Sequence, residues 1–122
     1  MAQTLNLFLD QGTTFSANIT VRDSSGTVRD ISDYTARSQF RRSYLSANSN
    51  SFTATIETGT DGNVRLQMSA ADSSNVVAAR YLYDVEIVSN TTSAVERIIE
   101  GIVVVTPEVT RWARINQLPE KN

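Results

Sequence analysis

The chain contains no cysteine and no histidine among its 122 residues. Disulfide bonds, thiolate nucleophiles and metal sites built on cysteine or histidine are therefore excluded. Acid–base and nucleophilic catalysis usually depend on these two residue types or on a tuned pair of carboxylates. Both residue types are missing here, so we expect a chain without enzymatic activity and without a cofactor.

Long apolar runs and excess charge are also missing. Apolar runs such as Ile102–Val105 are far shorter than the roughly 20 residues that a membrane-spanning helix needs. The first residues lack the basic segment and long apolar core of a secretory signal. The net charge of −2 and the pI near 5.0 predict no general attraction to nucleic acid or to an anionic membrane. Basic charge is almost entirely arginine, since Lys121 is the only lysine.

What the sequence does contain is a series of short alternating segments. The clearest is Arg80–Val88, in which Tyr81, Tyr83, Val85 and Ile87 share one side and Leu82, Asp84, Glu86 and Val88 share the other. This is the pattern of a half-buried β-strand, and its Tyr, Val and Ile content favours the same structure. A polar turn and a second run, Val95–Thr106, follow it. Together they predict a hairpin on which a core can be built.

The same alternation predicts the other strands and the fold class. Ser69 followed by Asp72 resembles a helix N-terminus, so we expect one or two helical turns there. The pattern of the last run changes at Gly101, where we expect a β-bulge. About seven short strands with turn signals every 8–12 residues predict an all-β, antiparallel β-sandwich with one short helical turn. The remaining predicted strands are Thr4–Leu9, Thr13–Arg22, Tyr34–Arg42, Phe52–Thr58 and Val64–Met68, with Thr27–Ile31 as a short hairpin partner.

Pro107 ends the last strand, so we predict a sandwich over residues 1–107 and a tail over residues 108–122. The tail contains Trp112, the only tryptophan of the chain, between Arg111 and Arg114. Either this side chain packs back onto the sandwich or it docks on a neighbouring subunit, as a single large aromatic anchor can do. The tail is therefore a candidate docking arm in a homo-oligomer.

One cluster of basic side chains has an aromatic residue beside it. It could be a solvated surface, or a protein contact, because arginine and tyrosine are enriched in interface cores. It could also contact nucleic acid phosphates, but the acidic pI argues against that. We take as candidate partner-binding residues Arg37, Gln39, Arg41, Arg42 and Tyr44 from this cluster and Arg111, Trp112 and Arg114 from the tail.

Two segments carry acidic side chains that could serve chemistry or metal binding. Asp84 and Glu86 lie on one side of a strand, roughly 7 Å apart by strand rise, so a carboxylate pair is geometrically feasible. We expect them instead to line the wet side of an antiparallel sheet, facing arginines such as Arg97. Asp61-Gly62-Asn63 could donate oxygen ligands to calcium, but a lone segment of this type is expected to be a turn.

Three segments resemble a known protein class: Y-T-A-R-S-Q-F-R-R-S-Y at Tyr34–Tyr44, R-Y-L-Y-D-V-E-I-V at Arg80–Val88, and E-G-I-V-V-V-T-P-E-V-T-R at Glu100–Arg111. In this order and spacing they resemble small virion structural proteins of tailed bacteriophages, notably those that infect cyanobacteria. The layout is also similar to the N-terminal immunoglobulin-like domain of phage upper-baseplate proteins. The resemblance implies an Ig-like sandwich located in the virion, and it carries over no catalytic or ligand residue.

Baseplate proteins of that class continue into long fibre or receptor-binding regions, whereas this sequence has only a short tail after the resemblance ends. We therefore expect a non-catalytic subunit of the baseplate, tail or neck, with a capsid decoration protein as the alternative. Its expected partners are other virion proteins and copies of itself, not nucleic acid, a membrane or a small-molecule substrate. A second alternative is a carbohydrate- or host-surface-binding sandwich, which would need exposed aromatic side chains such as Tyr44, Tyr81, Tyr83 or Trp112.

Overall fold

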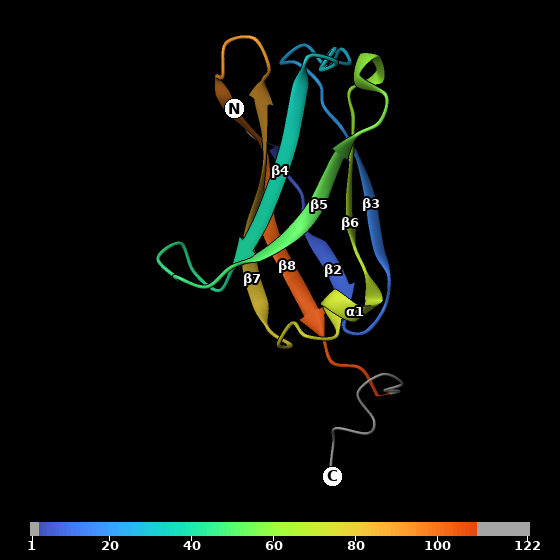
Figure 1. The fold of residues 1–122 in the computed structure, drawn as a ribbon, viewed down its shortest axis with the longest axis vertical. Coiled ribbons are helices and arrows are strands. Elements are labelled where there is room, and N and C mark those ends of the chain that lie inside the picture. Colours follow the sequence, from blue (N-terminus) through green and yellow to red (C-terminus); the bar gives the residue numbers. More distant parts are fainter. Residues whose placement is uncertain (1–2, 110–122) are drawn as a thin grey trace.

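The computed structural model describes residues 3–109, which form an Ig-like β-sandwich (Figure 1). The fold class predicted from the sequence is therefore confirmed. The elements in chain order are β1 (Gln3–Thr4), β2 (Leu7–Asp10), β3 (Phe15–Thr20), β4 (Tyr34–Arg41), β5 (Asn50–Ile56), the 3-10 turn η1 (Gly59–Asp61), β6 (Asn63–Met68), α1 (Ala70–Ser73), β7 (Arg80–Ser89) and β8 (Val95–Thr106).

The two layers of the sandwich belong to one continuous order of strands, β1-β8-β7-β4-β5-β6-β3. Strand β5 joins the layers, because its first residues pair with β4 and the residues from Thr53 to Ile56 pair with β6. Strands β1 and β2 pair with β8 in parallel, whereas all other strand pairs are antiparallel. The sheet is therefore mixed at its N-terminal edge, which the short apolar segment Thr4–Leu9 did not reveal.

The core lies between the layers and is filled by the inward side chains of every strand from β2 on. Strand β7 alternates as predicted, with Tyr81, Tyr83, Val85 and Ile87 buried and their neighbours outward. Aromatic rings meet across the core, with Phe40 packed 4.8 Å from Phe52 and edge-on to Tyr81 at 5.1 Å between ring centroids. Such pairs stabilise a core beyond the area they bury. Apolar packing thus holds the described part of the chain together, as expected for a cysteine-free sandwich.

The bulge in the last hairpin is not at Gly101, as the sequence suggested, but three residues earlier. Val85 pairs with Ile99 and Glu86 pairs with Arg97, so Ile98 is the extra residue and both isoleucines are buried. Gly101 pairs regularly with Tyr83. Glycine is required there for another reason: a Cβ would lie 2.9 Å from the Leu5 carbonyl carbon and closer still to its oxygen. The N-terminal segment runs parallel to the last strand here and brings the Leu5 carbonyl close to Gly101.

The predicted helical turn is present and closes one end of the sandwich. The Ser69 side chain accepts a hydrogen bond from the Asp72 N–H at 3.1 Å, as the cap predicted. Ser73, fully buried, accepts from the Gly12 N–H at 3.0 Å and donates to the Thr13 carbonyl at 2.8 Å. This hydroxyl ties α1 to the loop between β2 and β3. Within residues 3–109 no helix has the length and hydropathy to cross a membrane.

Candidate functional site

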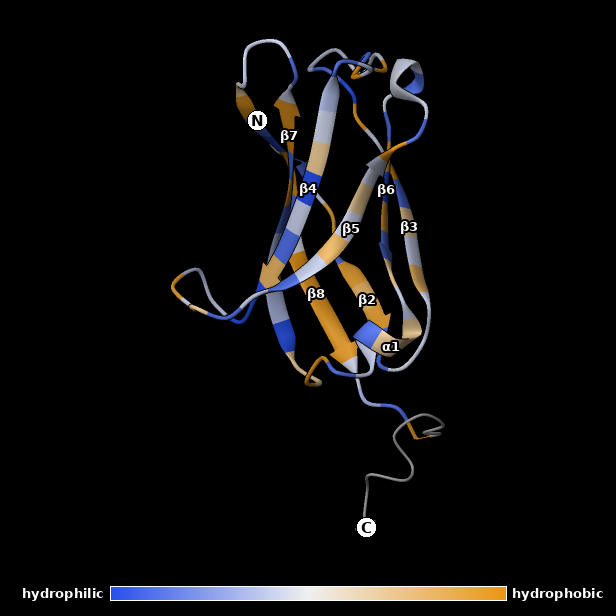
Figure 2. Cartoon of the chain, in the orientation of Figure 1, coloured by the Kyte–Doolittle hydropathy of each residue, from blue (hydrophilic) through white to orange (hydrophobic). Residues whose placement is uncertain are grey.

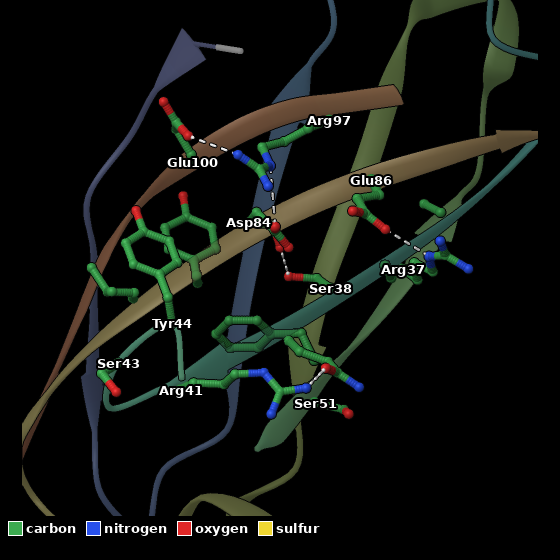
Figure 3. A pocket seen from close by; sticks show the side chains of 16 residues that line it. Arg37, Ser38, Arg41, Ser43, Tyr44, Ser51, Asp84, Glu86, Arg97 and Glu100 are labelled. Carbon is green, nitrogen blue, oxygen red and sulfur yellow. Dashed lines mark hydrogen bonds and ion pairs between the residues drawn. The ribbon is translucent and has the colours of Figure 1, made fainter. Parts of the chain in front are cut away.

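A groove of about 640 Å³ lies over the outward side of β4, β7 and β8 (Figure 3). We call this side of the sandwich the outer face, and this hollow the charged groove. Outward positions on adjacent strands lie side by side, because the register pairs Arg37 with Glu86 and Gln39 with Asp84. The charged residues lining the groove are Arg37, Arg41, Arg97, Asp84, Glu86 and Glu100, with Tyr44 at its rim.

The charges in the groove form ion pairs across strands. The Arg37 Nε atom lies 2.8 Å from a Glu86 carboxylate oxygen. Asp84 and Glu100 are direct cross-strand neighbours, and like charges in that position repel. Arg97 lies between them, 3.2 Å from Asp84 and 3.4 Å from Glu100. Two carboxylates thus share one guanidinium and keep acceptor capacity for a further donor.

The fold alters the protonation of the Asp84 carboxyl in the groove. Burial raises its pKa, and the negative charge of Glu86 raises it further, while Arg97 acts in the opposite direction. The net effect is that the charged form of Asp84 is disfavoured relative to the unfolded chain. An additional cation brought close to this carboxylate would therefore be bound favourably.

The structure brings together several of the residues chosen from the sequence. Arg37, Gln39 and Arg41 point outward from β4, and the Arg41 guanidinium donates to the Gln39 side chain at 2.9 Å and to the Ser46 carbonyl at 2.8 Å. Tyr44 follows in the loop and is 79% exposed. The Arg42 guanidinium instead lies over the ring of Tyr81 at 5.8 Å from its centroid. The other three candidates, Arg111, Trp112 and Arg114, lie outside the described residues.

The basic cluster expected from β4 is interleaved with acidic side chains in the folded chain. Strand β7 places Asp84 and Glu86 beside it, and β8 adds Glu100. The expectation that Asp84 faces Arg97 is confirmed, whereas Glu86 pairs with Arg37. The arginines and the carboxylates belong to segments that are far apart in the sequence. The strand register brings them together into a surface of mixed charge.

Next to the charged groove the outer face carries a row of apolar side chains that sequence reasoning missed. Phe8 on β2 pairs with Val104 on β8, and Leu82 on β7 pairs with Ile102 on β8. Phe8 is 69% exposed and the other three are half-buried. We call these four side chains the apolar row. A signal existed: both Leu7–Leu9 and Ile102–Val105 are apolar at consecutive positions, so each strand must present apolar side chains on both sides.

The opposite side of the sandwich lacks such a row. The outward residues of β3, β5 and β6 are polar or charged, as expected for a sheet surface in water. Figure 2 shows the contrast, since β2 and the C-terminal half of β8 are largely continuous orange, whereas β3 and β5 alternate between tan bands and pale or blue ones. The outward residues in question are Ser16, Asn18, Thr20, Thr53, Thr55, Arg65 and Gln67.

The segment Asp61-Gly62-Asn63, considered above as a possible calcium site, forms a turn, as expected. Asp61 belongs to η1, and Gly62 follows it with a φ of 67°, a left-handed conformation that glycine adopts without strain. In residues 3–109 no group of three or more acidic side chains is placed to hold a metal ion.

Comparisons with known proteins give fold likenesses only. No family model matches the chain, and no curated protein matches it. Listeria monocytogenes InlP is 12% identical with a TM-score of 0.44 over 86% of this chain, which spans 28% of that protein's chain. The NK cell receptor Nkp44 is 12% identical with a TM-score of 0.45, covering 87% of this chain and 99% of that chain. The Lin-41 filamin domain is 16% identical with a TM-score of 0.37, covering 75% and 81%. We draw no functional argument from likenesses at this level.

Proposed function

We propose that this chain is a non-catalytic assembly module of a tailed-bacteriophage virion, and that it binds protein partners through its outer face. The observation that carries the proposal is the apolar row beside the charged groove. Protein interfaces combine a desolvated apolar centre with a polar rim, and aromatic residues and arginine are enriched in them. The outer face offers both parts, with the exposed Phe8 ring in the apolar row and Arg37 and Tyr44 in the charged groove beside it.

The state of the charged side chains supports binding rather than chemistry. A catalytic carboxylate pair needs two acids with contrasting environments and a free approach for the substrate. Here Asp84 and Glu86 each hold an arginine, at 3.2 and 2.8 Å. The same pairs argue against nucleic acid as the partner, because phosphates would meet three carboxylates in the groove together with the arginines.

The resemblance of Tyr34–Tyr44, Arg80–Val88 and Glu100–Arg111 to virion proteins supplies the assignment to a particle. The baseplate, tail or neck is the preferred location, and capsid decoration is the alternative. Immunogold electron microscopy of purified virions, with an antibody against this chain, tests both. Label at the tail tip or neck supports the first location and label over the head supports the second. A chain absent from purified particles overturns the virion assignment.

The role of the outer face is tested by complementing a phage that lacks this gene product. Phe8→Ser removes an exposed apolar side chain and should leave the fold intact while reducing incorporation into particles. Ser16→Ala, a small change on the polar opposite side, is the matched control and should be incorporated normally. Equal incorporation of both variants would contradict the use of the outer face.

A second candidate function, binding of a carbohydrate or host surface, has one observation in its favour. Tyr44 is exposed at the rim of the groove, close to the polar side chains Gln39 and Asp84. Tyr81 and Tyr83 are buried and donate their hydroxyls to the backbone, so they are not available for stacking. A glycan-array signal that disappears in Tyr44→Ala but persists in Phe8→Ser would favour this function over the first.

A further inference from the structure

We infer that the occupant of the outer face is the C-terminal segment of a neighbouring copy of this chain, with Trp112 packed on the apolar row and its flanking arginines at the shared carboxylates of the groove. The inference rests on the proposed function and names the partner that it requires. It is carried by three properties of the described residues: the apolar row, the acceptor capacity beside it, and the course of the chain after β8.

The chemistry of the segment after Val109 matches the outer face. Its sequence, T-R-W-A-R-I, has a tryptophan and an isoleucine three residues apart, with an arginine directly before each. The apolar row presents one aromatic ring and three aliphatic side chains to receive such residues. Beside the row, Asp84 and Glu100 share the single guanidinium of Arg97. A second guanidinium would find carboxylate oxygens with free acceptor sites there, in the geometry that arginine suits.

The outer face is the side of the sandwich suited to this partner. The residues of the opposite side, on β3, β5 and β6, are polar and include no exposed aromatic side chain. A tryptophan docked there would displace water from hydroxyls and amides without gaining apolar contact. On the apolar row the same tryptophan covers Phe8, whose 69% exposure leaves most of its ring in water.

The course of the chain after β8 favours docking of Trp112 on a neighbouring copy rather than on its own outer face. The Glu108 N–H donates to the Gln11 side chain at 3.1 Å, and the Gln11 amide donates to the Val76 carbonyl at 2.8 Å. Gln11 follows β2 and Val76 follows α1, so these bonds hold the chain under the end of the sandwich (Figure 1). Trp112 follows Val109 by three residues, about 10 Å of extended chain. Reaching its own row would require a reversal within that length, whereas the row of a neighbour requires none.

Engineered cysteines test the inference cleanly, because the natural chain contains none. Arg80 is exposed on β7 and pairs with Val104, so it borders the apolar row. In the double variant Arg80→Cys/Ala113→Cys, Trp112 and the row are intact. Mild oxidation should link copies through disulfides into covalent dimers and longer species on a non-reducing gel. The matched control Ser16→Cys/Ala113→Cys places the first cysteine on the polar opposite side and should give several-fold less intermolecular product.

A third change separates docking from chance collision. Adding Trp112→Ala to the Arg80→Cys/Ala113→Cys protein should reduce the linked product to the level of the control. A disulfide that closes within one chain, seen as a monomer with a shortened hydrodynamic radius, would overturn the neighbour assignment. Equal yields from the test and control pairs would overturn the outer face as the docking surface.

Analytical ultracentrifugation of the natural chain and of two variants measures self-association independently of the cross-links. Removal of an anchor at the centre of an interface typically weakens binding by about thirtyfold or more. Phe8→Ser should therefore shift self-association to higher concentration by that factor. Val95→Ser is the control. It changes an exposed valine at the start of β8, far along the strand from the apolar row, and should leave self-association unchanged. Unchanged association in Phe8→Ser would contradict the inference.

These measurements separate this inference from the proposed function. If no cross-link forms but Phe8→Ser still blocks incorporation into particles, the outer face binds a different virion protein and only the inference fails. If the cross-link forms but Phe8→Ser is incorporated normally, copies associate through this face and the assembly function assigned to it fails.

Discussion

Replacing Gly101 by alanine tests the close approach of the Leu5 backbone to the last strand. The Leu5 N–H donates to the Glu100 carbonyl at 3.0 Å, and the Leu5 carbonyl accepts from the Tyr83 hydroxyl at 2.6 Å. Both bonds hold the Leu5 backbone directly over Gly101. An added Cβ would lie 2.9 Å from the Leu5 carbonyl carbon and closer to its oxygen, and both are backbone atoms that cannot rotate away.

Two effects of opposite sign decide the change in stability. Alanine restricts the unfolded chain more than glycine does, which alone would stabilise the fold by about 0.4–1 kcal/mol. Against this, forcing a methyl group into a packed site destabilises by about 1–3 kcal/mol. Displacing the Leu5 carbonyl also weakens its bond with Tyr83, a loss of about 0.5–1.5 kcal/mol. The steric and hydrogen-bond terms together exceed the entropic one, so we expect Gly101→Ala to destabilise the protein by about 0.5–4 kcal/mol.

A double-mutant cycle with Tyr83→Phe identifies the cause. Alone, Tyr83→Phe removes the hydroxyl that donates to the Leu5 carbonyl and should lower the free energy of unfolding by about 1 kcal/mol. In the Gly101→Ala background that hydrogen bond is already lost, so the second change should have almost no effect. The two sites should therefore show a coupling energy of about 1 kcal/mol, as expected for residues that share a partner.

Urea unfolding of the four proteins, followed by tryptophan and tyrosine fluorescence and by circular dichroism, gives the free energies. Equal slopes of the unfolding free energy against urea would indicate that the folded and unfolded states are comparable across the set. A stabilised Gly101→Ala protein would show that the Leu5 segment does not lie over this residue. Strictly additive effects of the two changes would show that the Tyr83 hydroxyl does not bond to Leu5.

Three further predictions follow from buried groups. Ser73→Ala removes the acceptor of the Gly12 N–H from a fully buried position, so thermal unfolding should show a loss of about 1–3 kcal/mol, and an unchanged melting temperature would contradict it. Because burial and Glu86 raise the pKa of Asp84, the folded protein binds more protons than the unfolded chain between the ordinary and the raised pKa, and stability falls as pH rises through that window. Asp84→Asn cannot ionise, so its stability relative to the natural chain should increase from pH 3 to pH 7, and a decrease would reverse the assigned sign. Val85→Asp places an unpaired charge in the core and should abolish folding, as judged by loss of the cooperative unfolding transition; a stable variant would mean that this strand buries its other side.

Much of the fold could be predicted because the relevant signals are local. The alternation from Tyr81 to Ile87 identifies a strand and the side it buries, since side chains on a strand point in opposite directions at successive positions. The cap at Ser69 likewise depends on a bond between residues three positions apart. Such signals need no knowledge of the neighbours in space.

Only part of the candidate site could be predicted from such local signals. The arginines of β4 are visible in the sequence as a cluster, but the carboxylates that neutralise them come from strands more than forty residues later. The apolar row was missed for a similar reason. Phe8 and Val104 become neighbours through a parallel pairing of β2 with β8, and nothing in either segment specifies that pairing.

Two conclusions can be reached from the sequence alone: the chain is an all-β sandwich, and it lacks the cysteine and histidine residues that thiol or imidazole chemistry needs. Those conclusions follow from composition and from the period of the side chains, which each segment carries alone. The tertiary structure decided the position of the bulge at Ile98, the reason for glycine at position 101, and the assembly of mixed charges and apolar side chains on one outer face. These depend on which strands pair and in which register, and register is set by the packing of the whole core rather than by any one segment.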